Sequence, residues 1–240
     1  MTRSIDFGRI ATGGVALIIG LWIGASGLIG EIAGYWDDIV YLAREHMILV
    51  AASGGAAILL GIPIGIWLSR PSMERYAESV MQVFNIGTTI PTLAVIALSM
   101  TLLGIGFPPA FFGLFVASLL PIVRNTYAGL LAVPPHLKEA ATGMGMTPMQ
   151  ILLHVEVPNA LYVIFSGIRT ALAINVGTTP LAFLIGGGGL GELIFTGIDL
   201  MDTGMLLAGA LPTALLAVLV DFLMGRAQLH LIPKGVNPLR

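Results

Sequence analysis

The sequence predicts an all-α membrane protein with six transmembrane helices. Charged residues make up 10% of the 240-residue chain, against roughly 25% in soluble domains, and the mean hydropathy is +0.94. Six apolar stretches have about the 20 residues that a helix needs to cross a bilayer core. They cover residues 10–29, 47–68, 80–103, 110–131, 159–181 and 205–224.

The first stretch follows Arg3 and Arg9, so a signal peptide is an alternative interpretation. Its apolar run is long for a signal peptide, and we therefore interpret residues 10–29 as an uncleaved helix. Residues 31–46 mix aromatic and acidic side chains. This composition suits either a segment at the membrane interface or a solvated loop.

Prolines separate the first helix from the other five. A proline frees a backbone carbonyl and kinks its helix, which a membrane tolerates where neighbouring helices or water satisfy the freed group. We therefore expect residues 1–46 to form a peripheral helix and an external segment, residues 47–228 to form the transmembrane domain around a polar route, and residues 229–240 to form a cytoplasmic tail. The prolines in or beside the later stretches are Pro63, Pro91, Pro121, Pro158, Pro180 and Pro212.

The distribution of lysine and arginine predicts that both termini lie in the cytoplasm. Positive charge favours the cytoplasmic side of a membrane. With the N-terminus inside, only Arg44 falls outside and Arg169 lies within a helix, whereas the outer segments are acidic. The cytoplasmic segments and helix ends hold the other basic residues, Arg3, Arg9, Arg70, Arg75, Arg124, Lys138, Arg226, Lys234 and Arg240.

The sequence argues against several other functions. A net charge of −2 provides no clustered basic face for nucleic acid. Without cysteine the chain can form no disulfide or thiolate metal site, and the histidines are spread over helix ends and polar segments, so we expect no metal. The motifs of metalloproteases, serine hydrolases and ATP-binding phosphate loops are absent. We therefore expect no catalytic residue and no bound cofactor, and any ATP must bind a partner chain.

The most informative polar segment is the predicted cytoplasmic loop 132–158. Pro135 suits the first turn of a helix, and Gly145 can adopt the left-handed conformation that ends one. Thr147 can cap a second helix, because Gln150 follows three residues later and completes a capping box. We therefore expect a helix, a glycine turn and a second short helix.

The loop contains Glu139-Ala140-Ala141, followed by Gly145, Val155, Val157 and Pro158. This pattern resembles the EAA loop in the permease subunits of bacterial ABC importers. The family usually has Ile and Leu where this chain has Val155 and Val157, and the resemblance extends over about residues 48–226. It implies that the loop is the coupling helix that sits in a groove of a separate ATPase subunit. The residues implied for this coupling are Glu139, Ala140, Ala141, Gly143, Gly145, Thr147 and Pro158.

Five stretches narrow the resemblance within this family, residues 82–91, 120–126, 143–148, 167–170 and 188–191. In them the chain looks most like permeases for the osmoprotectants glycine betaine, choline and carnitine. The similarity implies a type I core of five helices with an added first helix, in the bacterial cytoplasmic (inner) membrane. The implied partners are a dimer of ATPase subunits that binds ATP and Mg, a second permease copy or a paralogue, and an external substrate-binding protein. The alternatives are a permease for another small solute, such as methionine or a sulfonate, and a non-transporting membrane scaffold.

The glycine-rich run 185–191 formally contains Gly-x-Gly-x-x-Gly. A dinucleotide site would need a preceding strand in a soluble βαβ unit, which the predicted helices exclude. We expect instead a flexible bend before a short amphipathic segment, residues 192–202. The resemblance implies that Gly188, Gly189 and Gly191 lie near the outer gate.

Three charged residues fall within the predicted spans. Arg169 is expected near the midplane, where a charge costs at least about 2.5–3.5 kcal/mol. It should therefore pair with another residue inside the bundle or line the pore. Arg124 and Asp221 are expected nearer the inner helix ends, where they can pair with each other or reach the membrane surface.

Uncharged polar residues are better candidates for the translocation path, because they can hydrate a small zwitterion. Hydrogen bonding between helices, worth about 0.6 kcal/mol for each bond, is the alternative role. The candidates are Gln82, Asn85, Thr88 and Thr89 on the third helix and Asn175, Thr178 and Thr179 on the fifth.

Overall fold

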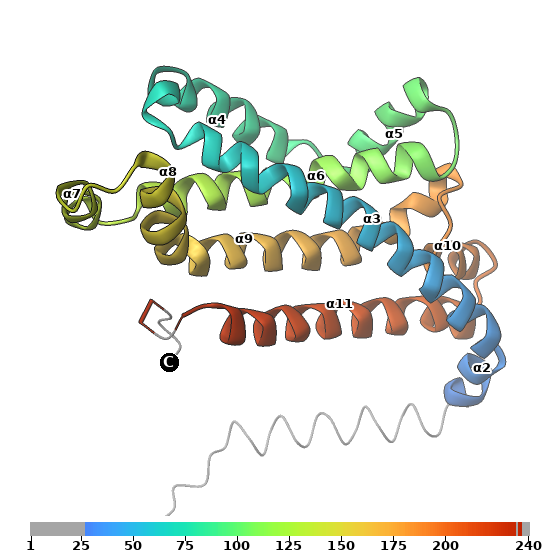
Figure 1. Ribbon diagram of the computed structural model, residues 1–240. Helices are drawn as coiled ribbons and strands as arrows, with labels where there is room; N and C mark the ends of the chain where they lie inside the picture. The colour runs from blue at the N-terminus through green and yellow to red at the C-terminus, as the bar shows by residue number, and fades with distance from the viewer. Residues whose placement is uncertain (1–26, 234, 237–240) are drawn as a thin grey trace, which may run out of the picture.

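The computed structural model describes residues 27–233, 235 and 236, which form a bundle of helices without a β-strand (Figure 1). The predicted first helix, residues 10–29, lies almost entirely outside this range. Four of the described helical stretches are long and apolar enough to cross a membrane, and counting one sharply bent pair as a further span gives five. The prediction of an all-helical membrane protein with several spans is therefore confirmed.

The second predicted helix begins earlier than expected. It is α3 (Trp36–Leu68), and only Tyr35 separates it from the short helix α2 (Leu28–Gly34). Asp37 and Asp38 lie in its first turn, where carboxylates interact favourably with the helix dipole. The segment 31–46 is therefore mostly helical, and α3 crosses the expected boundary between residues 46 and 47.

The third predicted helix is broken into α4 (Glu74–Thr89) and α5 (Thr92–Leu103), which meet at an angle of 98°. Pro91 has no N–H for the helical ladder and disfavours helical dihedrals in the residue before it. Ile90 accordingly has extended dihedrals, with φ −75° and ψ 124°. Pro91 therefore breaks the predicted helix rather than only kinking it.

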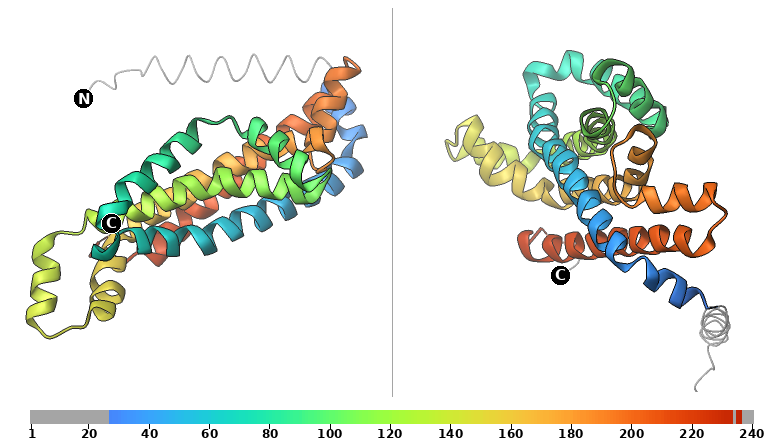
Figure 2. Two further views of the ribbon diagram at one scale, coloured as in Figure 1. Left: turned by 90° about the horizontal axis from the view of Figure 1, so that it is seen from above. Right: turned by 90° about the vertical axis from the view of Figure 1, so that its right-hand side faces the viewer.

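The remaining long helices are α6 (Phe107–Leu131), α9 (Val157–Thr178) and α11 (Thr203–Leu231). Helices α3, α6 and α9 pack along one another, and α11 lies against α9 (Figure 2). Between α9 and α11 the chain forms the 3-10 helix η3 (Thr179–Ile185) and the short helix α10 (Gly191–Asp199). The predicted fifth helix therefore changes type beside Pro180, where the proline removes a backbone donor.

Glycines bring α3 and α6 into close contact. A Cβ at Gly61 would lie 2.8 Å from Cγ2 of Ile122, and a Cβ at Gly65 would lie 2.6 Å from Cβ of Thr126. Both distances are shorter than the contact distance between packed carbon atoms. Only glycine therefore fits at these two positions without a shift of the helices.

The two ends of the bundle differ in charge, because one end mixes basic and acidic residues and the other is mainly acidic. One end includes the short 3-10 helix η1 (Pro71–Met73) and the loop between α6 and α9, which projects beyond the other helices in Figure 2. The opposite end includes α2 and α10 (Figure 1). The loop end holds Arg70, Arg75 and Lys138 together with Glu74, Glu78, Glu139 and Glu156, whereas the other end holds Arg44 and the carboxylates Glu31, Asp37, Asp38, Glu45, Glu192, Asp199 and Asp202.

Candidate functional site

The loop between α6 and α9 contains the predicted local structure. Its first helix is α7 (Pro135–Gly143), and Gly145 follows in the left-handed conformation with φ 80°. Thr147 then caps α8 (Pro148–Ile151). The Thr147 N–H donates to Gln150 Oε1 over 2.8 Å, and the Gln150 N–H donates to Thr147 Oγ1 over 3.4 Å. The predicted glycine turn and capping box are confirmed.

The second helix of the loop is not a separate short helix, contrary to the prediction. α8 continues into η2 (Leu152–Glu156), a π-helical segment, and η2 continues into α9. The stretch Pro148–Ile185 is one helical element of 38 residues. A π-helical segment shifts the backbone hydrogen bonds by one residue, and Pro158, which has no N–H, lies just beyond it in the first turn of α9.

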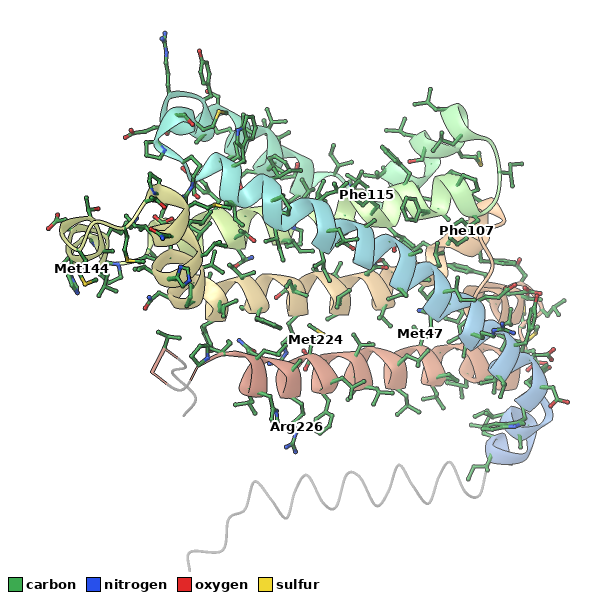
Figure 3. The ribbon with its side chains drawn as sticks, in the orientation of Figure 1. Met47, Phe107, Phe115, Met144, Met224 and Arg226 are labelled. Atoms are coloured by element: carbon green, nitrogen blue, oxygen red, sulfur yellow. The ribbon has the colours of Figure 1, made fainter. Side chains whose placement is uncertain are left out.

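One side of the loop is exposed and combines small residues with methionines. Met144 lies at the tip of the loop (Figure 3) and is 75% exposed. Ala141, predicted to share this surface, is buried at 1% exposure, because it faces the inside of the loop. The exposed residues include Glu139, Ala140, Thr142, Gly143, Met144, Gly145, Thr147 and Met149.

A buried carboxylate connects the loop to the membrane bundle. Glu156 on η2 is only 7% exposed. Its Oε2 accepts from Arg70 Nη1 over 2.6 Å, and its Oε1 lies 3.5 Å from Lys138 Nζ. Arg70 follows the C-terminal end of α3 and Lys138 belongs to α7. Sequence reasoning missed this cluster, although Glu156 is a carboxylate in an otherwise apolar run.

The intramembrane charges pair differently from the prediction. Asp221 on α11 forms an ion pair with Arg169 on α9, with Arg169 Nη2 donating to Asp221 Oδ2 over 2.5 Å. Pairing inside the bundle, one of the two roles expected for Arg169, is therefore present, whereas the pair between Arg124 and Asp221 is not. The reason is that α9, rather than α6, packs beside α11. Arg124 is exposed, and none of the ion pairs within residues 27–233 includes it.

The structure divides the candidate path residues into two separate groups. Gln82, Asn85, Thr88 and Thr89 are exposed on α4. Thr88 lines a cavity of about 170 Å³ with residues of α5, α6 and α9. The candidates on α9 and η3 do not line this cavity, and two of them are buried in a different place.

That second group belongs to a hydrogen-bond network between helices. Asn175 Nδ2 donates to Ser53 Oγ on α3 over 2.9 Å and to Ser118 Oγ on α6 over 2.7 Å. Thr179 Oγ1 lies 2.8 Å from the Asn175 carbonyl oxygen and 3.2 Å from Asn175 Oδ1, whereas Thr178 donates to the Ile174 carbonyl. Asn175 and Thr179 are fully buried. In this conformation their amide and hydroxyl groups hold three helices together.

The glycine run forms a tight turn against α3, as expected for a bend. Gly188 and Gly189 have φ values of 73° and 84°, which favour glycine. The Gly189 N–H donates to Glu45 Oε2 over 3.4 Å. A Cβ at Gly191 would lie 2.0 Å from the Pro180 carbonyl oxygen. The start of α10 is therefore in direct contact with the beginning of η3.

His46 lies beside this turn and is fully buried. Its Nε2 lies 3.1 Å from the Val176 carbonyl oxygen, and because a carbonyl only accepts, the ring donates from Nε2. Pro180, four residues after Val176, has no N–H for that carbonyl, so His46 replaces the missing donor. The sequence indicated only that His46 lies at a helix end. Its role depends on the contact with Val176, which is distant in the chain and could not be predicted.

A polar contact also stabilises the start of α11. Asp202 Oδ1 accepts from the Met205 N–H over 2.8 Å, and its Oδ2 accepts from the Tyr35 hydroxyl over 2.9 Å. These two hydrogen bonds hold the pKa of Asp202 below its ordinary value. The same bond to Asp202 raises the pKa of Tyr35.

Comparisons with known sequences agree with this architecture. Residues 61–234 match the family described as "Binding-protein-dependent transport system inner membrane component". The osmoprotectant import permease protein OsmY of Salmonella typhimurium is 53% identical over 92% of this chain and 94% of its own. The choline transport system permease protein OpuBB of Bacillus subtilis is 38% identical over 85% of this chain and 93% of its own.

Solved structures share the fold. The methionine ABC transporter MetNI in an inward-facing conformation has a chain that matches with a TM-score of 0.71 and 26% identity, over 79% of this chain and 94% of that one. An amino acid ABC transporter solved with histidines matches with a TM-score of 0.63 and 18% identity, over 82% and 93% of the two chains. The chain therefore belongs to the family of binding-protein-dependent inner membrane components, the permease subunits of ABC importers.

Proposed function

We propose that the chain is the permease subunit of an ATP-driven importer for glycine betaine, choline or carnitine. The names of OsmY and OpuBB support this class of solute. The observation that carries the coupling role is the projecting loop, whose small residues lie beside the exposed Met144 and Met149. An exposed apolar patch of this kind is typical of a docking surface. We assign it to the ATPase subunit, because ATP must bind a partner chain.

We further propose that residues 10–29 add a peripheral sixth span and that both termini lie in the cytoplasm. The basic residues around the loop support this orientation, since positive charge favours the cytoplasmic side. The glycine turn and α10 then lie on the outer side. There an external binding protein delivers the solute to a gate that includes Gly188, Gly189 and Gly191.

The proposed path follows α4 and the cavity lined by Thr88. Four polar side chains are exposed on α4, and a water-filled route accommodates them better than hydrocarbon does. We place this route between two permease copies, this chain and a second copy or a paralogue. Asn175 and Thr179 act in the path only if their network opens during transport.

The coupling role is tested by uptake and by co-purification of the ATPase with variants of the loop. Glu139→Lys reverses the exposed charge, and Gly145→Pro is incompatible with the left-handed turn. Both are expected to lose the ATPase and to abolish ATP-dependent uptake. Glu74→Lys, which changes an exposed carboxylate on α4, serves as the control. Normal uptake with both loop variants would show that the loop is not the docking surface.

The solute is tested by competition in cells that carry only this permease. Uptake of labelled glycine betaine should be reduced by unlabelled choline or carnitine and left unchanged by methionine. Methionine is the informative competitor, because the similar MetNI structure is that of a methionine transporter. If methionine alone competed, the chain would be a permease for methionine, the alternative solute.

A further inference from the structure

Glu156 holds together three parts of the cytoplasmic end of the protein. Its carboxylate is on η2, between the loop and α9, and its two oxygens face cations from two other elements. Arg70 follows α3, and Lys138 is on α7. The carboxylate is thus the meeting point of the coupling loop with two helices of the membrane bundle.

Burial makes the loss of this ionic contact energetically costly. The Glu156 side chain is 9% exposed, whereas those of Arg70 and Lys138 are 25% and 33% exposed. Removing the partner of a buried charge is strongly destabilising, so the two cations are held near Glu156. The Arg70 guanidinium is also oriented from the other side, since Nη2 donates to Ser69 Oγ over 2.8 Å and Nε to the Ile66 carbonyl over 3.2 Å.

The backbone connects the loop to α9 but not to α3. Movement of α8 reaches α9 directly, because α8, η2 and α9 are one helical element. Helix α3 is separated from the loop by α4, α5 and α6 in the chain, so a movement of the loop reaches it only through side-chain contacts. The hydrogen bond between Arg70 and Glu156 supplies such a contact across 86 positions of sequence.

We propose that Glu156 is a positioning residue that couples α7 and the inner end of α3 to α9, so that movement of the loop displaces these helices together. The inference rests on the proposed importer function. Loss of the Glu156 contacts would leave the docking surface intact, because Glu139, Met144 and Met149 do not take part in them. In a variant without these contacts, ATP hydrolysis should therefore continue while the amount of solute taken up per ATP falls.

The test compares Glu156→Gln with Glu78→Gln, an exposed carboxylate on α4, in the complete transporter. ATPase co-purification, the rate of ATP hydrolysis and uptake are measured for each. For Glu156→Gln, co-purification and hydrolysis should persist while uptake per ATP hydrolysed falls by roughly tenfold, within the range of ordinary coupling energies. Glu78→Gln should behave as the wild type. Unchanged uptake per ATP for Glu156→Gln would overturn the inference and leave the importer function standing.

Charge-preserving substitutions separate coupling from general damage. Arg70→Lys and Lys138→Arg should retain most of the uptake per ATP, whereas Arg70→Gln and Lys138→Gln should resemble Glu156→Gln. If the charge-preserving and charge-removing variants are equally impaired, the positioning role is wrong. Failure of the wild type to couple any uptake to ATP would instead contradict the proposed function itself.

A distance measurement tests the geometry without transport. The chain has no cysteine, so spin labels can be placed at Thr142→Cys on α7 and Ser72→Cys on η1, both of which are exposed. The distance distribution should broaden when Glu156→Gln is added and remain narrow with Glu78→Gln. An unchanged distribution would show that the carboxylate does not fix the loop to the end of α3.

Discussion

The ion pair between Arg169 and Asp221 joins two membrane helices. Loss of either residue would leave the other as an unpaired charge. A charge near the bilayer centre costs at least about 2.5–3.5 kcal/mol. We therefore expect Arg169→Leu or Asp221→Leu to lower the thermal unfolding midpoint in detergent and the amount of protein in the membrane. The double variant Arg169→Leu/Asp221→Leu should recover most of both. A double variant as unstable as the single ones would show that the pair has a role beyond mutual neutralisation.

The pH dependence of stability is a second test at the scale of single residues. The Met205 N–H and the Tyr35 hydroxyl lower the pKa of Asp202 in the folded protein, and its ordinary value is about 3.9. The ionised group is thus favoured by folding, so its contribution is complete above the ordinary pKa and is lost as the pH falls through the lowered one.

Asp202→Ala should therefore lower the unfolding midpoint at pH 7, and the difference from the wild type should shrink in acid. Midpoints measured across neutral and acidic pH give this difference directly. Asp199→Ala, which removes an exposed carboxylate near the end of α10, is the matched control. A difference that does not depend on pH would contradict the role assigned to the ionised carboxylate.

At the scale of elements, the contact between α3 and α6 depends on glycine at defined positions. A Cβ at Gly65 would meet Thr126 Cβ and the Val123 carbonyl oxygen at 2.6 and 2.9 Å. At Gly55, on the same helix, a Cβ would meet nothing within 4 Å. Gly65→Ala is expected to lower the unfolding midpoint because the helices must separate, whereas Gly55→Ala should leave it unchanged or raise it. Equal effects of the two substitutions would argue against close packing at Gly65.

Elements defined by neighbouring residues could be predicted from the sequence, and contacts between distant residues could not. The turn at Gly145 and the capping box of Thr147 and Gln150 depend on a few adjacent positions, and both are present. The pair between Arg169 and Asp221 joins positions 52 apart. Depth in the membrane alone favoured Arg124 as the partner, because the packing of α11 on α9 is not encoded in apolar composition.

Two other features of the structure could not be predicted from local sequence patterns. A proline inside an apolar stretch is compatible with a kink as well as with a break, so the sequence indicated one stretch and did not reveal the 98° turn between α4 and α5. Asn175 is equally compatible with a solvated path and with a buried network. Its two serine partners lie on different helices, and only their packing decides between the roles.

At the scale of the whole molecule, the basic residues beside the loop predict how the protein lies in the membrane. Single cysteines at Thr142 and Thr203 are informative, because both residues are exposed and lie at opposite ends. An impermeant thiol reagent applied to intact cells should label Thr203→Cys, and it should label Thr142→Cys only after the membrane is opened. The reverse pattern would overturn the proposed orientation.

The π-helical segment η2 also sets the direction in which the loop faces. Each residue of an α-helix turns the side-chain direction by roughly 100°, and η2 stands between the loop and α9 without a flexible hinge. Deletion of one residue from Leu152–Glu156 would therefore rotate the loop about the axis of α9 by about that angle. Surface loops commonly tolerate changes of length. This one should accept no insertion or deletion, because the register of η2 sets the direction of the whole proposed docking surface.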